Sequence, residues 1–288
     1  MIKSLEKIEW MVNHPERWDF SGTRELYAGV DLGTYKTIAI VVDEQGNPCA
    51  ANMRRAEVVR SGLILDYLGA LNIVKELIEE IRYHAPLPVE RGATSYPPQT
   101  ESANVDTTTY VLQGAGVEVL SVLDEPSAAN QVLRVQDGAI VDVGGGTTGV
   151  AVVEDGEIVY SNDEATGGIH LSLVLAGHLK IGLEEAEALK TSNRRNGHIL
   201  PIVRPVIEKM SSIVATHLEG FQKVNRVWLV GGTCELEGFG EIVRNALGLE
   251  VSKPPSPQMV TPFGIALSCL DAIAEKKRDS WMNGQTAK

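Results

Sequence analysis

Apolar residues along the chain form two alternating patterns, short continuous runs and longer stretches with helical spacing. The short runs, which have the length of buried strands, lie at 27–30, 38–42, 92–96, 117–120, 149–153 and 227–230. The longer stretches predict helices at 66–84, 101–114, 169–181, 183–191, 201–219 and 236–247, and two more that begin at Pro126 and near Thr261. Strands that alternate with helices are typical of an α/β protein with mixed sheets.

The strand pattern repeats once. Residues 30–37 and 141–148 share Val, Asp, Gly and Thr in register, and each segment leads into an apolar strand and then an acidic turn that ends in glycine, at Gly46 and Gly156. Although a single Asp-x-Gly turn is common between strands, the repetition of order, spacing and flanks favours a duplicated unit. The sequence therefore predicts two related lobes.

The lobe boundaries follow from this repeat. We expect a first lobe at 26–138, with a small insert at about 50–95, and a second lobe at 139–276. Residues 1–25 form an accessory segment in which Leu5, Ile8 and Met11 recur at helical spacing, and residues 277–288 form a polar tail. The last helix, at about 262–276, is expected to pack back on the first lobe.

Composition and charge restrict the function. The 288 residues are 43% hydrophobic and 22% charged, which is ordinary for a globular protein. The net charge of −12 argues against nucleic acid or an anionic membrane as a partner. A protein this acidic holds an anionic ligand through local backbone amides and a divalent cation rather than through its overall field.

The N-terminus and the cysteines indicate the compartment. The first 20 residues carry charges among their apolar positions, unlike a signal peptide, and no apolar run is long enough to span a bilayer. Cys49, Cys234 and Cys269 are scattered, which is typical of reduced thiols. We therefore expect a cytoplasmic protein.

The two Asp-x-Gly turns are the strongest candidates for a binding site. Glycine allows the backbone to approach a phosphate closely, threonine adds a hydroxyl donor, and aspartate can hold Mg²⁺ through water. Two such turns that face one another would bring Asp31 and Asp142 to one metal ion. Each turn alone is equally well explained as a tight β-turn.

Other candidates are weaker when taken singly. Glu125 lies at a strand-to-helix junction, where it either positions a water for phosphoryl transfer or forms part of a helix N-terminus that Asp124 caps. The glycine pairs at 167–168 and 231–232 are more often turns than sites, and Glu187 with Lys190 usually marks a solvated helix face. The histidines and cysteines lack the spacing of a structural zinc site.

Five segments, taken in order, resemble the superfamily of actin, DnaK-type chaperones and sugar kinases. They are GVDLGT at 29–34, LDEPSAA at 123–129, DVGGGT at 142–147, VGGT at 230–233 and FGIAL at 263–267. Within the superfamily, the chain most closely resembles the EutJ family of ethanolamine-utilisation proteins. That resemblance is carried by SYPP at 95–98, VLDEP at 122–126, DEATGG at 163–168 and LEEAE at 183–187.

The resemblance implies a two-lobed, actin-like (ribonuclease H-like) ATPase fold with duplicated mixed sheets and a cleft for ATP or ADP with Mg²⁺ between the lobes. Asp31 and Asp142 become the metal-side carboxylates, acting through water, and Glu125 becomes the residue that positions the attacking water. These three are the candidate catalytic residues. The implied nucleotide contacts are Gly33, Thr34, Tyr35, Gly144, Gly145, Gly146, Thr147, Gly167, Gly168, Glu187, Lys190, Gly231, Gly232 and Thr233.

Two departures bear on activity. Tyr35 is bulkier than the small residue that DnaK-type chaperones have after Thr34, and the first lobe has no clear counterpart of their catalytic lysine. A slow ATPase, or nucleotide binding without hydrolysis, is consistent with both.

The function implied is that of an ATP-binding, chaperone-like protein of ethanolamine utilisation. Its protein client would be a cobalamin-dependent ethanolamine ammonia-lyase or the shell proteins of a bacterial microcompartment, with which a cytoplasmic protein would associate. Neither nucleic acid nor membrane is an expected partner. Two alternatives stay open, an actin-like filament or scaffold former that assembles as a homo-oligomer, and a small-molecule kinase.

Overall fold

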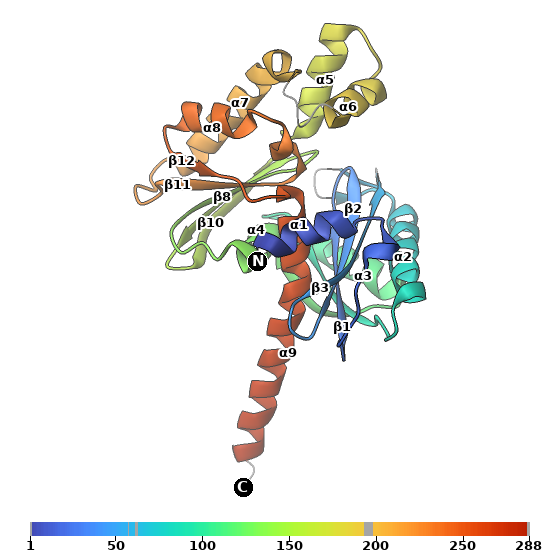
Figure 1. The fold of residues 1–288 in the computed structure, drawn as a ribbon. Helices are drawn as coiled ribbons and strands as arrows, with labels where there is room; N and C mark the ends of the chain where they lie inside the picture. Colours follow the sequence, from blue (N-terminus) through green and yellow to red (C-terminus); the bar gives the residue numbers. More distant parts are fainter. Residues whose placement is uncertain (1, 57, 61–62, 193–197, 287–288) are drawn as a thin grey trace.

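The computed structural model describes residues 2–56, 58–60, 63–192 and 198–286, and within them two five-stranded sheets form the centres of two lobes (Figure 1). The first sheet has the strand order β3-β2-β1-β6-β7. Its strands are β1 (Leu26–Leu32), β2 (Lys36–Asp43), β3 (Pro48–Arg55), β6 (Arg91–Tyr96) and β7 (Glu118–Asp124). The second sheet has the order β10-β9-β8-β11-β12. Its strands are β8 (Gly138–Val143), β9 (Thr148–Glu154), β10 (Glu157–Glu164), β11 (Arg226–Val230) and β12 (Glu250–Ser252).

The two sheets have the same topology. β1 pairs antiparallel with β2 and parallel with β6, and β8 likewise pairs antiparallel with β9 and parallel with β11. Asp31 and Asp142 occupy the same place, one residue before the end of the central strand of each sheet. The duplication expected from the repeat is therefore present in the strand order as well as in the sequence.

Helices cover both sheets. The first lobe carries α2 (Tyr67–His84) and α3 (Ser102–Gly114). The second lobe carries α5 (Gly168–Leu179), α6 (Leu183–Ser192), α7 (Leu200–Leu218) and α8 (Phe239–Leu247). Asp66 caps the N-terminus of α2 by accepting a hydrogen bond from the amide of Gly69 (2.9 Å), and Asp124 caps α4 (Glu125–Leu133) by accepting one from the amide of Ser127 (3.0 Å). None of the helices in the described part of the chain is long and apolar enough to cross a membrane.

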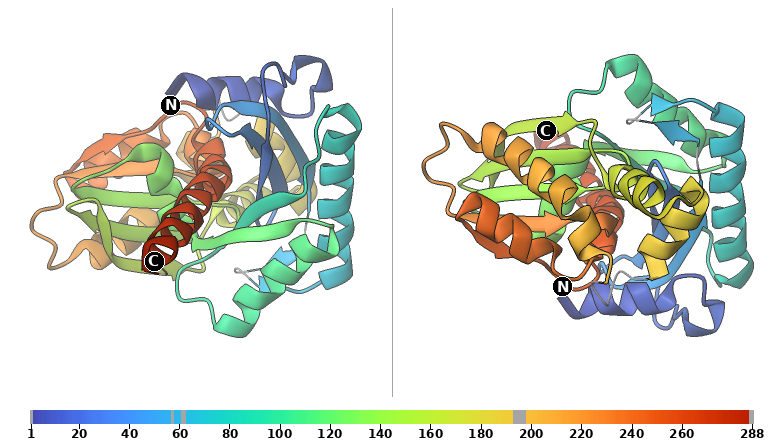
Figure 2. Two further views of the ribbon diagram at one scale, coloured as in Figure 1. Left: turned by 90° about the horizontal axis from the view of Figure 1, so that it is seen from below. Right: turned by 90° about the horizontal axis from the view of Figure 1, so that it is seen from above.

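Two helices connect the lobes. α4 (Glu125–Leu133) and α9 (Val260–Thr286) pack against one another, and α9 also packs on β1 and β6 of the first sheet. In both views of Figure 2, α9 lies between the two lobes. Gly264 makes the crossing of α4 and α9 possible, because a Cβ at this position would overlap the carbonyl oxygen of Ala128. The helix continues to Thr286, so residues 277–286 are helical and do not form the separate polar tail expected from the sequence.

The expected insert at about 50–95 is much smaller than predicted. Residues 48–55 and 91–96 are strands of the main sheet, and α2 packs on that sheet through Val74, Leu77 and Ile78. The inserted part that lies outside the five-stranded sheet is a short hairpin of β4 (Val59–Arg60) and β5 (Leu63–Ile64). The prediction was wrong because the sequence of β3, PCAANMRR, lacks the β-branched residues that mark a strand.

The N-terminal segment is part of the core. Helix α1 (Ile2–Met11) packs on β3 and on the short helix η3 (Pro257–Met259), and it is followed by the short helix η1 (Pro15–Arg17). Leu5, Ile8 and Met11 are 1%, 0% and 0% exposed and share a hydrophobic cluster with Met259 and Phe263. Because this cluster includes residues of both lobes, α1 bridges them rather than forming an accessory appendage.

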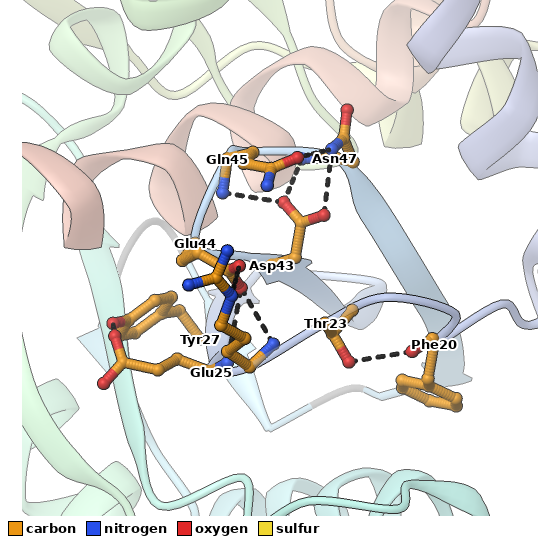
Figure 3. Close-up of polar contacts among 9 residues, drawn as sticks. Phe20, Thr23, Glu25, Tyr27, Asp43, Glu44, Gln45 and Asn47 are labelled. Atoms are coloured by element: carbon orange, nitrogen blue, oxygen red, sulfur yellow. Dashed lines mark hydrogen bonds and ion pairs between the residues drawn. The ribbon is translucent and has the colours of Figure 1, made fainter.

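The end of the first sheet remote from Asp31 is fixed by carboxylates (Figure 3). Asp43 accepts hydrogen bonds from the amides of Gln45 and Asn47, both at 2.8 Å, and from the Asn47 side chain. Glu44 accepts from the amides of Arg24 (3.1 Å) and Glu25 (3.3 Å). The bonds of Glu44 join the β2–β3 turn to the segment before β1. The strands on either side of the first hairpin, β1 and β2, are therefore anchored at the end remote from Asp31.

Candidate functional site

The two Asp-x-Gly hairpins face one another from opposite lobes and touch. A hydrogen bond from the Gly33 amide to the Lys36 carbonyl (3.1 Å) closes the first hairpin, and the bond from Gly144 to Thr147 (3.0 Å) closes the second. A Cβ placed on Gly146 would lie 2.9 Å from Oγ1 of Thr34, and one on Gly145 would overlap the ring of Tyr35. The tips of the two turns are therefore in direct contact across the cleft.

A cavity of about 1130 Å³ opens between the lobes beside these tips. It is large enough for a nucleotide, since small-molecule sites usually measure roughly 300–1,000 Å³. The residues predicted from the sequence that line it are Asp31, Gly33, Thr34, Tyr35, Asp142, Gly144, Gly145, Glu187, Lys190, Gly231, Gly232 and Thr233. Asp31 and Asp142, which are 111 positions apart in the sequence, thus share one cavity.

Five predicted residues do not line the cavity. Glu125, Gly146, Thr147, Gly167 and Gly168 are not among its lining residues. A Cβ on Gly167 would lie 2.5 Å from the Gly146 carbonyl carbon and the Thr147 amide, and one on Gly168 would lie 2.5 Å from Oγ1 of Thr233. Close packing, against backbone at Gly167 and against the Thr233 side chain at Gly168, therefore explains these two glycines, and their role as direct nucleotide contacts stays a prediction.

Four carboxyl groups, of which Asp31 and Asp142 line the cavity, lie within reach of one another's charge where the lobes meet. Burial and the charge of Asp142 raise the pKa of Asp31 to about 7. Burial raises the pKa of Asp142. The hydroxyl of Thr261 opposes this rise by donating a hydrogen bond to Oδ2 of Asp142 at 2.8 Å. Burial, followed by the charges of Asp142 and Asp31, raises the pKa of Glu125 well above its usual value. These acids therefore repel one another in a poorly hydrated site.

The fourth acid, Asp163, lies on the same row of the second sheet as Asp142. Gly149 pairs with Asp142 on one side and with Asp163 on the other, so the small residue between them leaves both carboxylates on one face. Burial raises the pKa of Asp163 to about 6, while a hydrogen bond from Thr147 lowers it. In the part of the chain that the structure describes, the buried Oδ1 of Asp163 has no hydrogen-bond partner.

This donor set fits a hydrated divalent cation. Carboxylate oxygens are the ligands that Mg²⁺ prefers, and Mg²⁺ keeps several of its waters in protein sites. A cation among Asp31, Asp142 and Asp163 would stabilise the ionised carboxylates, which burial disfavours in all three and the charge of Asp142 disfavours in Asp31 and Asp163. A metal-bound water would be a partner for Oδ1 of Asp163. Among the described residues, no three His, Cys, Asp or Glu side chains form a group that ligates a metal directly.

The second lobe supplies a connected polar wall. Lys190 donates to the Gly168 carbonyl (2.9 Å) and to Glu187 (2.7 Å), and Ser172 donates to the same Glu187 oxygen at 2.6 Å. The hydroxyl of Thr233, on the short helix η2 (Gly232–Glu235), donates to the Gly144 carbonyl at 2.7 Å. Helix α6 and the glycine turn after β11 are therefore fixed to the second hairpin, and Glu187 with Lys190 is not the solvated face that the spacing alone favours.

Several cleft residues were not found from the sequence. Lys36 lies directly after the first hairpin, and its ammonium donates across the cleft to the side-chain oxygen of Gln258. Arg55, at the end of β3, and Thr261, at the start of α9, also line the cavity. The N-terminal segment lines its rim through Glu9, Trp10 and their neighbours. Of these residues, only Lys36 could have been found from the sequence, because it lies two residues after Thr34 of the predicted phosphate-binding hairpin.

The features above define the class of protein. Two lobes of one topology, connected by α4 and α9 and facing each other through paired Asp-x-Gly hairpins, form an actin-like ATPase fold. The family model described as type IV pilus assembly protein PilM matches residues 98–263. MreB5 of Spiroplasma citri bound to AMPPNP superposes with a TM-score of 0.70 over 90% of this chain and 99% of that chain, at 15% sequence identity, which shows the fold alone.

More specific comparisons identify the family. The chain is 43% identical over 244 residues to the ethanolamine utilization protein EutJ of Escherichia coli K12, which covers 84% of this chain and 86% of that protein. The crystal structure of EutJ from Carboxydothermus hydrogenoformans has a TM-score of 0.86 and 42% identity, covering 92% of this chain and 98% of that chain. The chain belongs to the EutJ family of ethanolamine utilization proteins. The predicted fold and family are both confirmed.

Proposed function

We propose that this protein binds ATP and ADP with Mg²⁺ in the interlobe cleft and uses the bound nucleotide to control a protein partner in ethanolamine utilisation. The observation that carries the proposal is the convergence of Asp31 and Asp142, from two related hairpins, on one cavity. Membership of the EutJ family and the actin-like fold support it independently.

The phosphate chain is assigned to the tips of the hairpins. Because the amides of Gly33 and Gly144 close the turns, the cavity-lining residues Thr34, Tyr35 and Gly145 are left to present backbone amides and the Thr34 hydroxyl to phosphate oxygens. Asp31 and Asp142 would orient the waters of Mg²⁺ from opposite sides. The polar wall of Glu187, Lys190 and Thr233 would contact the nucleoside.

Bound ATP would supply a transferable phosphoryl group, and Glu125 would assist its transfer to water. Glu125 begins α4 immediately after β7, close enough to Asp142 and Asp31 for their charges to raise its pKa. A carboxylate whose pKa is raised is a stronger base and is therefore better suited to accept a proton from an attacking water. This makes slow hydrolysis the expected activity of the cleft, given that the Tyr35 ring crowds the hairpin tips.

The partner is proposed to be a protein, either ethanolamine ammonia-lyase or the shell proteins of a microcompartment, with this chain acting as a chaperone in the cytoplasm. Lobe closure on a nucleotide gives such a partner two states to distinguish. Exposed apolar side chains, which often mark protein contacts, lie on neighbouring elements of the first lobe at Leu63, Leu65, Tyr67, Leu68 and Tyr110.

The same exposed residues favour a second candidate, self-assembly into a filament or scaffold. Leu65 and Leu68 are each 66% exposed and Tyr110 is 56% exposed, which is unusual for large apolar residues close together. Light scattering that rises with protein concentration and depends on ATP would support assembly. A constant small oligomer with and without ATP would support the chaperone proposal instead.

The nucleotide proposal is tested by isothermal titration with Mg²⁺-ATP and Mg²⁺-ADP, followed by phosphate release. Asp142→Asn keeps the side-chain size but removes the charge, so we expect affinity to fall at least tenfold while circular dichroism stays unchanged. Asp106→Asn, an exposed position on α3, is the matched control and should bind as the wild type does. Equal affinity in Asp142→Asn and the wild type would refute the proposed site.

A further inference from the structure

The short segment 256–261 connects four elements of the cleft. Ser256 donates to Glu9 of α1, Gln258 accepts from Lys36 of β2, and Thr261 donates to Asp142 of β8 at 2.8 Å. The Pro257 carbonyl accepts from the amide of Gly231 at 3.0 Å. Since Ser256 and Gln258 are each only 8% exposed, the segment is held firmly in place.

Lys36 is the element of this network that reaches across the cleft. It starts on β2 of the first lobe, lines the cavity, and ends at Gln258 beside the glycine turn of the second lobe. A Cβ on Gly232 would lie 3.2 Å from its Nζ and 3.7 Å from Gln258. Its charge also reaches Asp31, where it partly opposes the rise in pKa that burial and Asp142 cause. The ammonium therefore lies between Asp31 and the glycine turn after β11, next to Thr233, which is assigned to the nucleoside.

Two lysines that line the cleft, Lys190 and Lys36, form different hydrogen bonds. Lys190 is bound to an ionised partner, Glu187, and to the Gly168 carbonyl. The cross-lobe bond of Lys36 is to a neutral amide oxygen, that of Gln258. Hydrogen bonds between an ammonium and an ionised oxygen are roughly twice as strong as those between neutral groups, so a phosphate oxygen can compete with Gln258 but not readily with Glu187.

We propose that Lys36 selects nucleotides by their phosphate chain. Its ammonium exchanges the amide oxygen of Gln258 for a phosphate oxygen, and Gln258 is a positioning residue that holds the ammonium in the cleft before the ligand arrives. The inference rests on the proposed nucleotide function and deepens it, because it assigns the preference for nucleoside di- and triphosphates over nucleosides to one side chain.

The exchange has two physical consequences. Because Gln258 already holds the Lys36 side chain in one arrangement, little further ordering is needed when phosphate binds. When the ammonium leaves Gln258, the first lobe loses a bond to the segment that also holds α1 and α9, so phosphate binding changes how the lobes are joined. Adenosine, which has no phosphate, would leave this bond intact.

The test is isothermal titration of full-length protein with ATP, ADP and adenosine, each with Mg²⁺, for the wild type, Lys36→Met and Gln258→Leu. In Lys36→Met, we expect the affinity for ATP and ADP to fall at least tenfold and the affinity for adenosine to stay within about twofold. Gln258→Leu keeps the ammonium but removes the partner that holds it in place, so ATP affinity should fall by no more than about threefold, much less than in Lys36→Met. Thermal melting of each variant checks that the fold is intact.

The outcomes separate the inference from the proposed function. A wild-type protein that binds none of the three ligands overturns both. If the wild type binds ATP and Lys36→Met binds ATP equally well, or loses ATP and adenosine to the same extent, the inference is wrong and the proposed function stands. A Gln258→Leu variant that loses ATP as severely as Lys36→Met would show that Gln258 itself contacts the ligand, which also contradicts the exchange.

Discussion

The ring of Tyr35 on the first lobe packs against Gly145 on the second, at a distance that leaves no room for a Cβ on Gly145. This contact closes the gap between the hairpins to which the phosphate chain is assigned. A phosphate between the hairpins therefore requires the Tyr35 ring to move aside. The contact between Tyr35 and Gly145 also explains why a glycine is needed at position 145, independently of any ligand.

Gly145→Ala is predicted to destabilise the protein through Tyr35. The added methyl group overlaps the ring, and overpacking of this kind costs about 1–3 kcal/mol of unfolding free energy. Urea denaturation of Gly145→Ala, Tyr35→Ala and the double variant measures the coupling. We expect Gly145→Ala to cost less than about 0.5 kcal/mol once Tyr35 is alanine, because the overlapping atoms are gone.

Gly177→Ala is the matched control for this cycle. Gly177 lies in α5, and an added Cβ there would meet no atom within 4 Å apart from the adjacent backbone of its own helix, so alanine should be neutral or slightly stabilising. Additive effects of the Tyr35 and Gly145 substitutions would mean that the two residues do not interact in solution.

The stability of the metal-free protein is predicted to fall as pH rises towards neutrality. The folded protein binds a proton at Asp31 up to a pKa of about 7, whereas the unfolded chain releases it near 3.8. Between these values the folded state holds more protons than the unfolded state, so unfolding free energy decreases with rising pH and levels off above about 7. The contribution of Asp31 is on the order of 2–4 kcal/mol.

Urea denaturation in EDTA at pH 5, 6, 7 and 8 tests this in the wild type and in Asp31→Asn. The variant cannot ionise at this position, so we expect its stability to fall less over the same range. Mg²⁺ should restore part of the stability lost at pH 8, where the carboxylates are ionised. Identical pH profiles for the two proteins would contradict the assigned proton affinity of Asp31.

Helix α1 is predicted to be necessary for stability. Ile8 is fully buried in the cluster that joins both lobes, and Ile-to-Ala substitutions at such positions cost about 2–5 kcal/mol. Ile8→Ala should lower the unfolding free energy by that amount, measured by denaturant titration. Leu68→Ala, at a residue that is 66% exposed, serves as the control and should change it little. Equal effects would indicate that α1 is only loosely attached.

Much of this protein could be predicted from local sequence. The hairpins at 31–36 and 142–148 are specified by Asp, Gly and Thr between apolar strands, because turn geometry depends on adjacent residues. The helix at 66–84 was predicted to within a residue, since its apolar spacing and its cap at Asp66 are both local. β10 and β12 were missed, because their exposed and polar residues resemble loops.

The sequence by itself determined the two related hairpins, the α/β order and the family, since repeated motifs and periodicity are properties of neighbouring residues. Only the tertiary structure decided which side chains meet. The bond of Lys36 to Gln258 joins residues 222 positions apart, and the packing of Tyr35 on Gly145 joins residues 110 positions apart. The direction in which one lobe presents a side chain to the other depends on how α4, α9 and α1 join the lobes. No local pattern encodes that orientation, because it arises from packing between distant segments.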